Sequence, residues 1–289
     1  MTEVETKLTA NHWGIGVAQV HQGRIVAVKG HESDPAASAI NGNIPGSLHG
    51  AARVLRPAVR KSWLEGTPDR VPRGQDSFVE ISWDRALDIV ADELKRVRDM
   101  HGNTGIFAGS YGWSSAGRFH HAQSQLKRFL NTLGGFVRSE GNYSYNAALE
   151  LMPHIVGPFR AHVAQATRWS VVAKHTKLVV LFGGMALRNT QVSDGGISRH
   201  RMGDNLAACA EAGVRFVNIS PLRSDADAVL SAEWMPVQPG SDTALMMGLA
   251  HTLLVEGLYD ADFLARFTVG FDKIEAYLTG SSDGTPKDA

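Results

Sequence analysis

The sequence contains almost no cysteine and no excess of charge of either sign. Its 289 residues include one cysteine, Cys209. A disulfide within the chain is therefore excluded, and so is a four-cysteine zinc site or iron–sulfur cluster built from this chain alone. The 29 Lys and Arg residues balance 29 Asp and Glu residues. This balance argues against a partner such as nucleic acid, which would be bound through a general basic surface.

The chain also lacks a long apolar segment. Its apolar runs, such as residues 178–182, are far too short to span a bilayer, so no membrane partner is expected. The N-terminus, MTEVETK, has neither a basic region followed by an apolar stretch nor a pair of arginines. No secretory signal is visible there. We therefore expect a cytoplasmic protein, with the periplasm as the alternative if a signal has been removed.

Several catalytic signatures are missing too. There is no Gly-x-Ser-x-Gly elbow, no phosphate-binding loop ending in Gly-Lys-Ser/Thr, and no Gly-x-Gly-x-x-Gly followed by a distal acid. These absences argue against a serine hydrolase of that type, a P-loop enzyme and a typical nicotinamide-dependent dehydrogenase. The histidines, including the pair at 120–121, show no metal-site spacing with carboxylates or cysteines.

What the chain does contain is an alternation of strand, loop and helix patterns. Hydrophobic residues make up 43% of it, enough to bury a large core. Residues 13–29 predict a β-hairpin, and Ser82 precedes a helix with apolar residues at helical spacing. Continuous apolar runs at 177–182 and 214–219 predict buried parallel strands, and 242–256 predict an apolar helix.

This alternation predicts an α/β fold with parallel sheets. We expect a small N-terminal β-rich segment over residues 1–60, an α/β domain over 61–165 and a dinucleotide-binding-like α/β domain over 166–289. Ligands of such sheets bind at the carboxyl ends of the strands. The loops expected at those ends are 109–113, 141–145, 183–190, 218–222 and 238–242.

Taken singly, the polar residues of these loops have two interpretations each. The glycine pair at 183–184 is suited to a close approach to phosphate or to a simple turn. Asp242 is suited to cap a helix, which is the local preference, or to accept hydrogen bonds from a guanine edge. Ser144 alone reads as a turn residue. Tyr111 and Trp113 are either core anchors or donors aimed into a cavity.

Taken together, the segments resemble the dimethyl sulfoxide reductase family of molybdenum enzymes. Residues 109–118, GSYGWSSAGR, resemble its active-site signature, and residues 141–144, GNYS, its molybdenum-ligand loop. The branch that looks most similar holds biotin sulfoxide, dimethyl sulfoxide and trimethylamine N-oxide reductases. Further matching segments, in order, are 11–14 (NHWG), 23–26 (GRIV), 34–35 (DP), 220–224 (SPLRS) and 240–246 (GSDTALM).

The resemblance implies a molybdenum cofactor, bis(molybdopterin guanine dinucleotide), and roles for particular residues. Ser144 would give its deprotonated oxygen to molybdenum, as suits a high-valent metal. Trp113 would donate its indole N–H to the oxygen at the metal, and Tyr111 its hydroxyl to that oxygen or to the substrate. The other cofactor-binding residues it implies are Tyr143, Tyr145, Gly184, Met185, Asn189, Thr190, Ile219, Ser220, Gly240, Ser241 and Asp242. At 185–186 the chain has Met-Ala where the family usually has Asn-Pro.

The activity that the resemblance implies is reduction of an S-oxide (biotin, methionine or dimethyl sulfoxide) by oxygen-atom transfer. Tyr111 favours S-oxides, because relatives specialised for amine oxides tend to lack it. The alternatives are a trimethylamine N-oxide reductase and a truncated, non-catalytic module that binds nucleotide or a partner. The lack of cysteine fits the branch without an iron–sulfur cluster, so we expect an external electron donor. Chains of this family are much longer, so we expect an N-terminal portion whose C-terminal domains complete the cofactor cleft.

Overall fold

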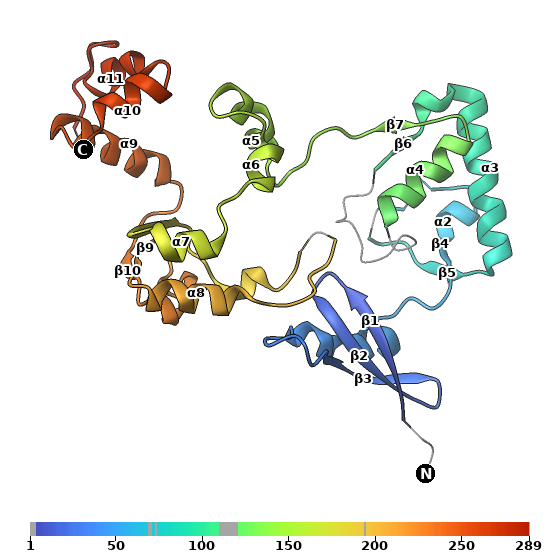
Figure 1. The fold of residues 1–289 in the computed structure, drawn as a ribbon. Coiled ribbons are helices and arrows are strands. Elements are labelled where there is room, and N and C mark those ends of the chain that lie inside the picture. Colours follow the sequence, from blue (N-terminus) through green and yellow to red (C-terminus); the bar gives the residue numbers. More distant parts are fainter. Residues whose placement is uncertain (1–3, 69–70, 73, 110–120, 194, 289) are drawn as a thin grey trace. The chain divides into compact units, whose positions relative to one another are not determined.

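The computed structural model of the chain describes residues 4–68, 71–72, 74–109, 121–193 and 195–288 (Figure 1). It is a mixed α/β fold with a small antiparallel N-terminal sheet and parallel sheets further on, as predicted. Two compact units are present. One contains Met1–Ala166 and Thr190–Arg201, and the other contains Thr167–Asn189 and Met202–Ala289. The three domains expected from the sequence stay a prediction.

None of the helices in the described part of the chain combines the length and the apolar character that a bilayer crossing requires.

The first unit begins with a three-stranded antiparallel meander. Strands β2 (Gly14–His21) and β3 (Arg24–Gly30) form the predicted hairpin. Gln22 and Gly23 between them have φ of 49° and 75°, the left-handed geometry that matches the twist of a two-residue hairpin. Strand β1 (Glu5–Asn11) pairs with β2 and was not predicted, because its residues are mostly polar and exposed.

A buried ion pair ties the start of this unit to its last segment. Asp34 and His200 have side chains that are 1% and 3% exposed, and His200 Nδ1 lies 2.7 Å from Asp34 Oδ2. The His200 backbone N–H donates to the other carboxylate oxygen at 3.0 Å. The other ring nitrogen lies 3.0 Å from the Gln191 carbonyl oxygen. The segment that follows Thr190 is therefore attached to the N-terminal region across 166 positions of sequence.

Short elements follow the meander between residues 39 and 80. They are η1 (Ala39–Asn43), α1 (Ile44–His49), β4 (Ala58–Arg60), α2 (Lys61–Leu64) and β5 (Phe78–Glu80), with β4 and β5 antiparallel. Asp76 holds this region together. Its carboxylate accepts from the Arg60 guanidinium at 2.9 Å and from the Ser62 hydroxyl at 2.5 Å.

The predicted helix after Ser82 is present as α3 (Trp83–His101). The Ser82 hydroxyl accepts from the Arg85 N–H at 3.2 Å, and Gly102, with φ of 68°, ends the helix. Strands β6 (Phe107–Ala108) and β7 (Val137–Arg138) pair in parallel. The other elements of this region are η2 (Asn103–Gly105) and α4 (Ala122–Thr132).

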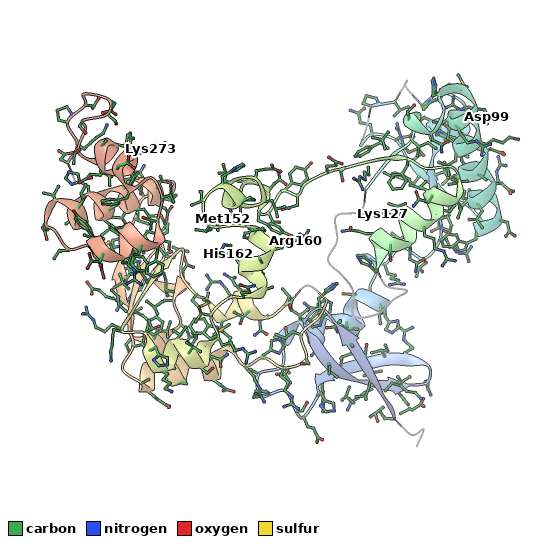
Figure 2. All side chains as sticks on the ribbon, turned by 45° about the horizontal axis from the view of Figure 1, so that its top comes forward. Asp99, Lys127, Met152, Arg160, His162 and Lys273 are labelled. Atoms are coloured by element: carbon green, nitrogen blue, oxygen red, sulfur yellow. The ribbon has the colours of Figure 1, made fainter. Side chains whose placement is uncertain are left out.

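A small helical segment follows, made of α5 (Asn146–Leu151), η4 (Met152–His154) and α6 (Phe159–Ala164). Met152, Arg160 and His162 of this segment are labelled in Figure 2. The His162 ring connects α6 to the preceding loop, because its Nε2 lies 2.6 Å from the Val156 carbonyl oxygen.

The second unit is built on a parallel sheet. Its strand order is β10 (Glu233–Met235), β9 (Arg215–Ile219) and β8 (Leu178–Phe182), with β9 in the centre. The two strands predicted from apolar runs are thus confirmed. Helices α7 (Trp169–His175) and α8 (Met202–Glu211) pack on the sheet. The core between them contains Leu181, Leu206, Cys209, Val214, Phe216 and Leu230.

The remaining elements of this unit lie in the loops and at the C-terminal end. Short helices η5 (Leu187–Thr190), η6 (Arg223–Asp225) and η7 (Ala228–Leu230) follow the strands. Three helices then complete the chain: α9 (Asp242–Val255), α10 (Ala261–Phe267) and α11 (Phe271–Leu278).

Candidate functional site

Three loops leave the same edge of the β10-β9-β8 sheet. The strands are parallel, so their carboxyl ends lie on the same side. The loops that leave them are 183–190, 220–226 and 236–242. This edge is where ligands of parallel α/β sheets bind. It carries Gly184, Met185, Asn189, Ser220 and the 240–242 segment, all of them predicted from the sequence.

The first two loops are joined through Asp225, which was not predicted. The Met185 N–H donates to the Asp225 carbonyl oxygen at 2.7 Å, and Met185 forms a parallel bridge with Ala226. Gly184, with φ of 86°, lies directly against Asp225. A Cβ added to Gly184 would stand 2.3 Å from that carbonyl oxygen. The glycine is therefore required where the two loops touch.

Ser220 is buried at the end of the central strand. Its hydroxyl donates to Asp225 Oδ2 at 2.5 Å, and its carbonyl oxygen accepts from the Trp234 indole at 2.8 Å. Ser220 and the preceding Ile219 are 1% and 3% exposed. Both residues are therefore covered by protein. The Ser220 hydroxyl makes its hydrogen bond within its own loop.

Arg188 brings a positive charge to the same place. Its guanidinium donates to Asp225 Oδ1 at 2.6 Å and to the Ser224 carbonyl oxygen at 3.2 Å. The side chain is 59% exposed. Asn189 and Thr190 follow it in η5. Neither Arg188 nor Asp225 was predicted from the sequence, because the two residues are 37 positions apart and pair only where their loops touch.

The third loop leads into helix α9. The local preference for Asp242 as the helix cap is wrong by one residue, because Ser241 is the N-cap and Asp242 begins the helix. The Ser241 hydroxyl does not cap either, since it donates to the Gln238 carbonyl oxygen at 2.6 Å. The Asp242 carboxylate thus lies in the first turn, close to the N–H groups of the helix start.

The predicted metal ligand lies in the first unit. Ser144 is exposed in the loop before α5. The Asn142 side chain shapes this loop, because its Oδ1 accepts from the Ser144 N–H at 3.0 Å and the Tyr145 N–H at 2.8 Å. Tyr143 is 97% exposed. The Tyr145 ring packs on Phe159 of α6 with 5.1 Å between centroids, which anchors the loop to the helices that follow.

Tyr111 and Trp113 lie outside the described residues. That Ser144 and the loops of the second unit bind one cofactor stays a prediction.

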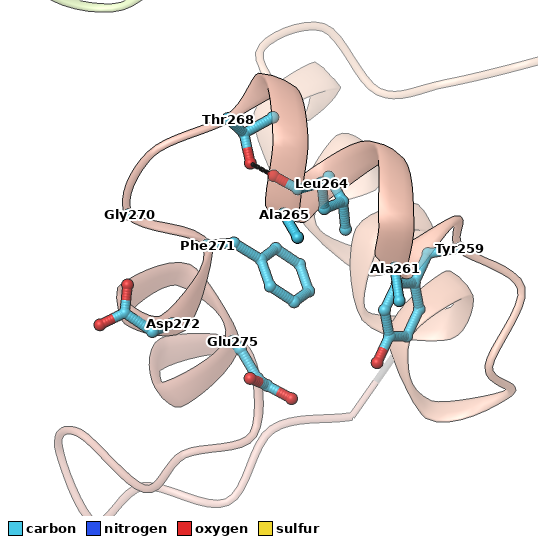
Figure 3. A pocket seen from close by; sticks show the side chains of 9 residues that line it. All are labelled: Tyr259, Ala261, Leu264, Ala265, Thr268, Gly270, Phe271, Asp272 and Glu275. Atoms are coloured by element: carbon cyan, nitrogen blue, oxygen red, sulfur yellow. Dashed lines mark hydrogen bonds between the residues drawn. The ribbon is translucent and has the colours of Figure 1, made fainter.

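A hollow elsewhere in the second unit does not involve any predicted site residue. It has a volume of about 320 Å³ and lies between α10 and α11 (Figure 3). Apolar side chains such as Leu264 and Phe271 line it, with Asp272 and Glu275 beside them. Among the described residues, no cluster of three or more His, Cys, Asp or Glu side chains forms a metal site.

Sequence comparison places the chain in a family. The family model described as molybdopterin oxidoreductase matches residues 53–275, and the model of the molybdopterin oxidoreductase N-terminal domain matches residues 9–49. The chain belongs to the molybdopterin oxidoreductase family.

Three relatives illustrate the similarity. The chain is 45% identical over 89% of its length to a biotin sulfoxide reductase of Cereibacter sphaeroides. It is 42% identical over 96% to a dimethyl sulfoxide/trimethylamine N-oxide reductase of the same organism. It is 40% identical over 99% to a trimethylamine-N-oxide reductase of Haemophilus influenzae. The matched regions are 34 to 35% of these relatives, so the chain spans about a third of their length.

The sheet edge has open space beside the backbone of two loops. At Gly183 and Gly240, with φ of 83° and 86°, an added Cβ would meet nothing within 4 Å. The backbone is therefore open to close approach at two of the three loops. Asn218, 1% exposed in β9, has an Oδ1 atom without a hydrogen-bond partner among the described residues. A buried acceptor of this kind requires a donor.

Proposed function

We propose that this chain is the N-terminal portion of a molybdenum-dependent oxidoreductase that reduces S-oxides by oxygen-atom transfer. The observation that carries the proposal is the match to the molybdopterin oxidoreductase model over residues 53–275. The 45% identity to a protein named biotin sulfoxide reductase supports the choice of substrate class. We further propose the guanine dinucleotide form of the cofactor, an external electron donor and a cytoplasmic location.

The three loops of the second unit are the proposed nucleotide-binding surface. The open backbone at Gly183 and Gly240 admits a bulky group. The exposed Arg188 guanidinium and the first N–H groups of α9 attract phosphate oxygens. Asp242, half-buried in the first turn of that helix, is placed to accept N–H groups of a guanine edge. When bound, the molybdenum cofactor supplies the two-electron chemistry of oxygen-atom transfer.

Ser144 is the proposed protein ligand of the metal. Its loop is shaped by the Asn142 side chain, so the two backbone N–H groups at 144 and 145 are satisfied within the loop. Ser144 itself is exposed. Tyr111 and Trp113 are proposed to donate hydrogen bonds to the oxygen that is transferred, where positioned donors act most strongly.

Replacing Ser144 tests this assignment. In Ser144→Ala, in the protein expressed with any coding sequence that continues past Ala289, we expect loss of sulfoxide reduction and an altered metal spectrum. The measurements are elemental analysis for molybdenum, X-ray absorption and turnover of dimethyl, methionine and biotin sulfoxides.

Ser124→Ala is the matched control, because Ser124 is an exposed serine whose hydroxyl donates to the His121 carbonyl oxygen. It should leave the spectrum and turnover unchanged. Full activity with an unaltered spectrum in Ser144→Ala would contradict the ligand assignment. A metal-free protein that reduces sulfoxides at the full rate would contradict the proposed function.

A second candidate is reduction of trimethylamine N-oxide. Two relatives at 42% and 40% identity carry that substrate in their names. Comparing kcat/KM for trimethylamine N-oxide with that for the three sulfoxides decides between the classes. A preference for the amine oxide that persists in Tyr111→Phe would favour this second candidate.

A further inference from the structure

One carboxylate lies at the contact between two of the three loops, and no role was expected for it. Asp225 accepts the Ser220 hydroxyl on one oxygen at 2.5 Å and the Arg188 guanidinium on the other at 2.6 Å. The three residues belong to two loops that leave neighbouring strands, β8 and β9. Asp225 is 18% exposed, whereas Arg188 is 59% exposed. The carboxylate thus holds the guanidinium from the protein side.

Backbone groups near Asp225 also connect the two loops. The Asp225 carbonyl oxygen accepts the Met185 N–H at 2.7 Å, and Gly184 leaves no room for a side chain against it. The Arg188 guanidinium also donates to the Ser224 carbonyl oxygen. The Asn218 amide adds a longer contact, 3.4 Å, to the Arg223 carbonyl oxygen. Both loops are therefore bound to each other on both sides of Asp225.

We infer that Asp225 is a positioning residue of the proposed cofactor-binding edge, which fixes the 183–190 and 220–226 loops in one register and orients the Arg188 guanidinium toward solvent. The inference rests on the proposed function only for what the edge binds. The residues that it holds are neighbours of Met185, Asn189 and Ser220, which are candidate cofactor contacts. A carboxylate that accepts hydrogen bonds from two donors restricts the relative motion of the segments that carry them, because charge-assisted hydrogen bonds are short and directional.

The protonation of Asp225 supports this arrangement. The Ser220 hydroxyl, and after it the Arg188 guanidinium, keep the pKa of the Asp225 carboxyl below its ordinary value, although partial burial acts in the opposite direction. The carboxylate therefore stays ionised and able to accept from both partners at neutral pH.

Amide hydrogen exchange of the chain, measured without any cofactor, tests whether Asp225 holds the two loops together. Asp225→Asn keeps the size of the side chain but replaces one acceptor oxygen by a donor, so Ser220 and Arg188 can no longer both be accepted. We expect peptides over 183–190 and 220–226 to exchange roughly tenfold faster, the scale of losing a charge-assisted hydrogen bond. Peptides over Leu206 and Cys209, in the core, should not change.

Asp227→Asn is the matched control. Asp227 lies two positions further on, and its carboxylate accepts a local hydrogen bond from the Val229 N–H at 3.0 Å. It should leave peptides over 183–190 unchanged. Arg188→Gln removes the exposed partner and should loosen 183–190 as Asp225→Asn does, with no further effect in the double variant. Unchanged exchange at 183–190 in both single variants would overturn the inference, and so would an equal increase throughout the core.

Titration with guanosine diphosphate separates this inference from the proposed function. If the wild-type chain and Asp227→Asn bind the probe and Asp225→Asn binds it at least about fivefold more weakly, both ideas gain support. If no variant binds the probe but exchange changes only in the two loops, the positioning role of Asp225 is supported and the proposed nucleotide binding loses support. If Asp225→Asn binds as tightly as wild type, the positioning role is wrong, whatever the proposed function.

Discussion

At the scale of single residues, buried polar groups that find partners across the sequence organise this chain. Asp34 and His200 are the clearest case, with the carboxylate and the ring almost fully buried. The two ring nitrogens lie 2.7 Å from Asp34 Oδ2 and 3.0 Å from the Gln191 carbonyl oxygen. Removing one partner of a buried pair leaves the other charge unpaired. The single cysteine, Cys209, is by contrast a packing residue, because burial raises the pKa of its thiol and keeps it unreactive.

The Asp34–His200 pair predicts a change of stability with pH. Burial acts to raise the pKa of Asp34, but hydrogen bonds from the backbone and ring of His200 and from Ala36 outweigh it and lower the pKa. A carboxyl with a lowered pKa stabilises the fold above its unfolded value, about 3.9, and loses that contribution as the pH falls through the folded pKa. The free energy of unfolding should therefore fall below about pH 4.

Urea unfolding at a series of pH values measures this effect. Asp34→Asn should cost about 3 kcal/mol at neutral pH and should show a weaker decline below pH 4 than wild type, because the pair is already broken. Asp92→Asn, at an exposed carboxylate of α3, serves as the control and should follow the wild-type curve. Identical pH slopes for wild type and Asp34→Asn would show that the pair does not govern acid stability.

At the scale of elements, the local sequence signals placed the β2–β3 hairpin, strands β8 and β9 and helices α3 and α9 correctly. The cap at Ser82, the turn at Gln22 and Gly23 and the apolar runs of β8 and β9 depend on neighbouring residues alone. Two departures from the sequence-based expectation have physical reasons. Strand β1 is polar and owes its strand form to pairing with β2. Gly184 looked like a phosphate-approach residue or a turn, and in the structure it is required by the contact with Asp225.

Two adjacent glycines allow this contact to be tested. Gly183 and Gly184 both have positive φ, but only Gly184 has atoms where a Cβ would lie, with the Asp225 carbonyl oxygen at 2.3 Å. Gly183→Ala should cost about 1 kcal/mol from backbone strain alone. Gly184→Ala should cost more than about 2 kcal/mol, because the two loops must also separate. Thermal or urea unfolding compares the two variants, and equal losses would mean that the contact contributes nothing.

At the scale of the whole molecule, helix α3 leaves large apolar side chains exposed. Helix α3 has no buried residue, and Trp83, Leu87 and Val90 on it are 67%, 61% and 52% exposed. The chain spans about a third of the length of the relatives it matches. Large exposed apolar patches indicate surfaces that normally contact other protein.

This surface should bind an apolar dye. We expect the chain by itself to enhance the fluorescence of anilinonaphthalene sulfonate and to associate as its concentration rises. A Leu87→Lys/Val90→Lys double variant should reduce both effects. Asp88→Lys, which changes charge on the same helix without removing apolar surface, should reduce neither. A monomeric wild-type chain with no dye signal would contradict the expectation.

The sequence by itself determined the class of the fold, the family and the loops in which the candidate residues lie, because hydrophobic periodicity, turn residues and the order of short motifs are local properties. It also indicated which loops follow parallel strands and therefore share one edge of a sheet. The tertiary structure decided which side chains form hydrogen bonds with one another at that edge. Asp225 and Arg188 carry no signal in their own segments, and the sequence predicted Ser220 as a cofactor contact without its hydrogen bond to Asp225. Their roles follow from two loops meeting in space, which depends on strand order and on close backbone contact at Gly184.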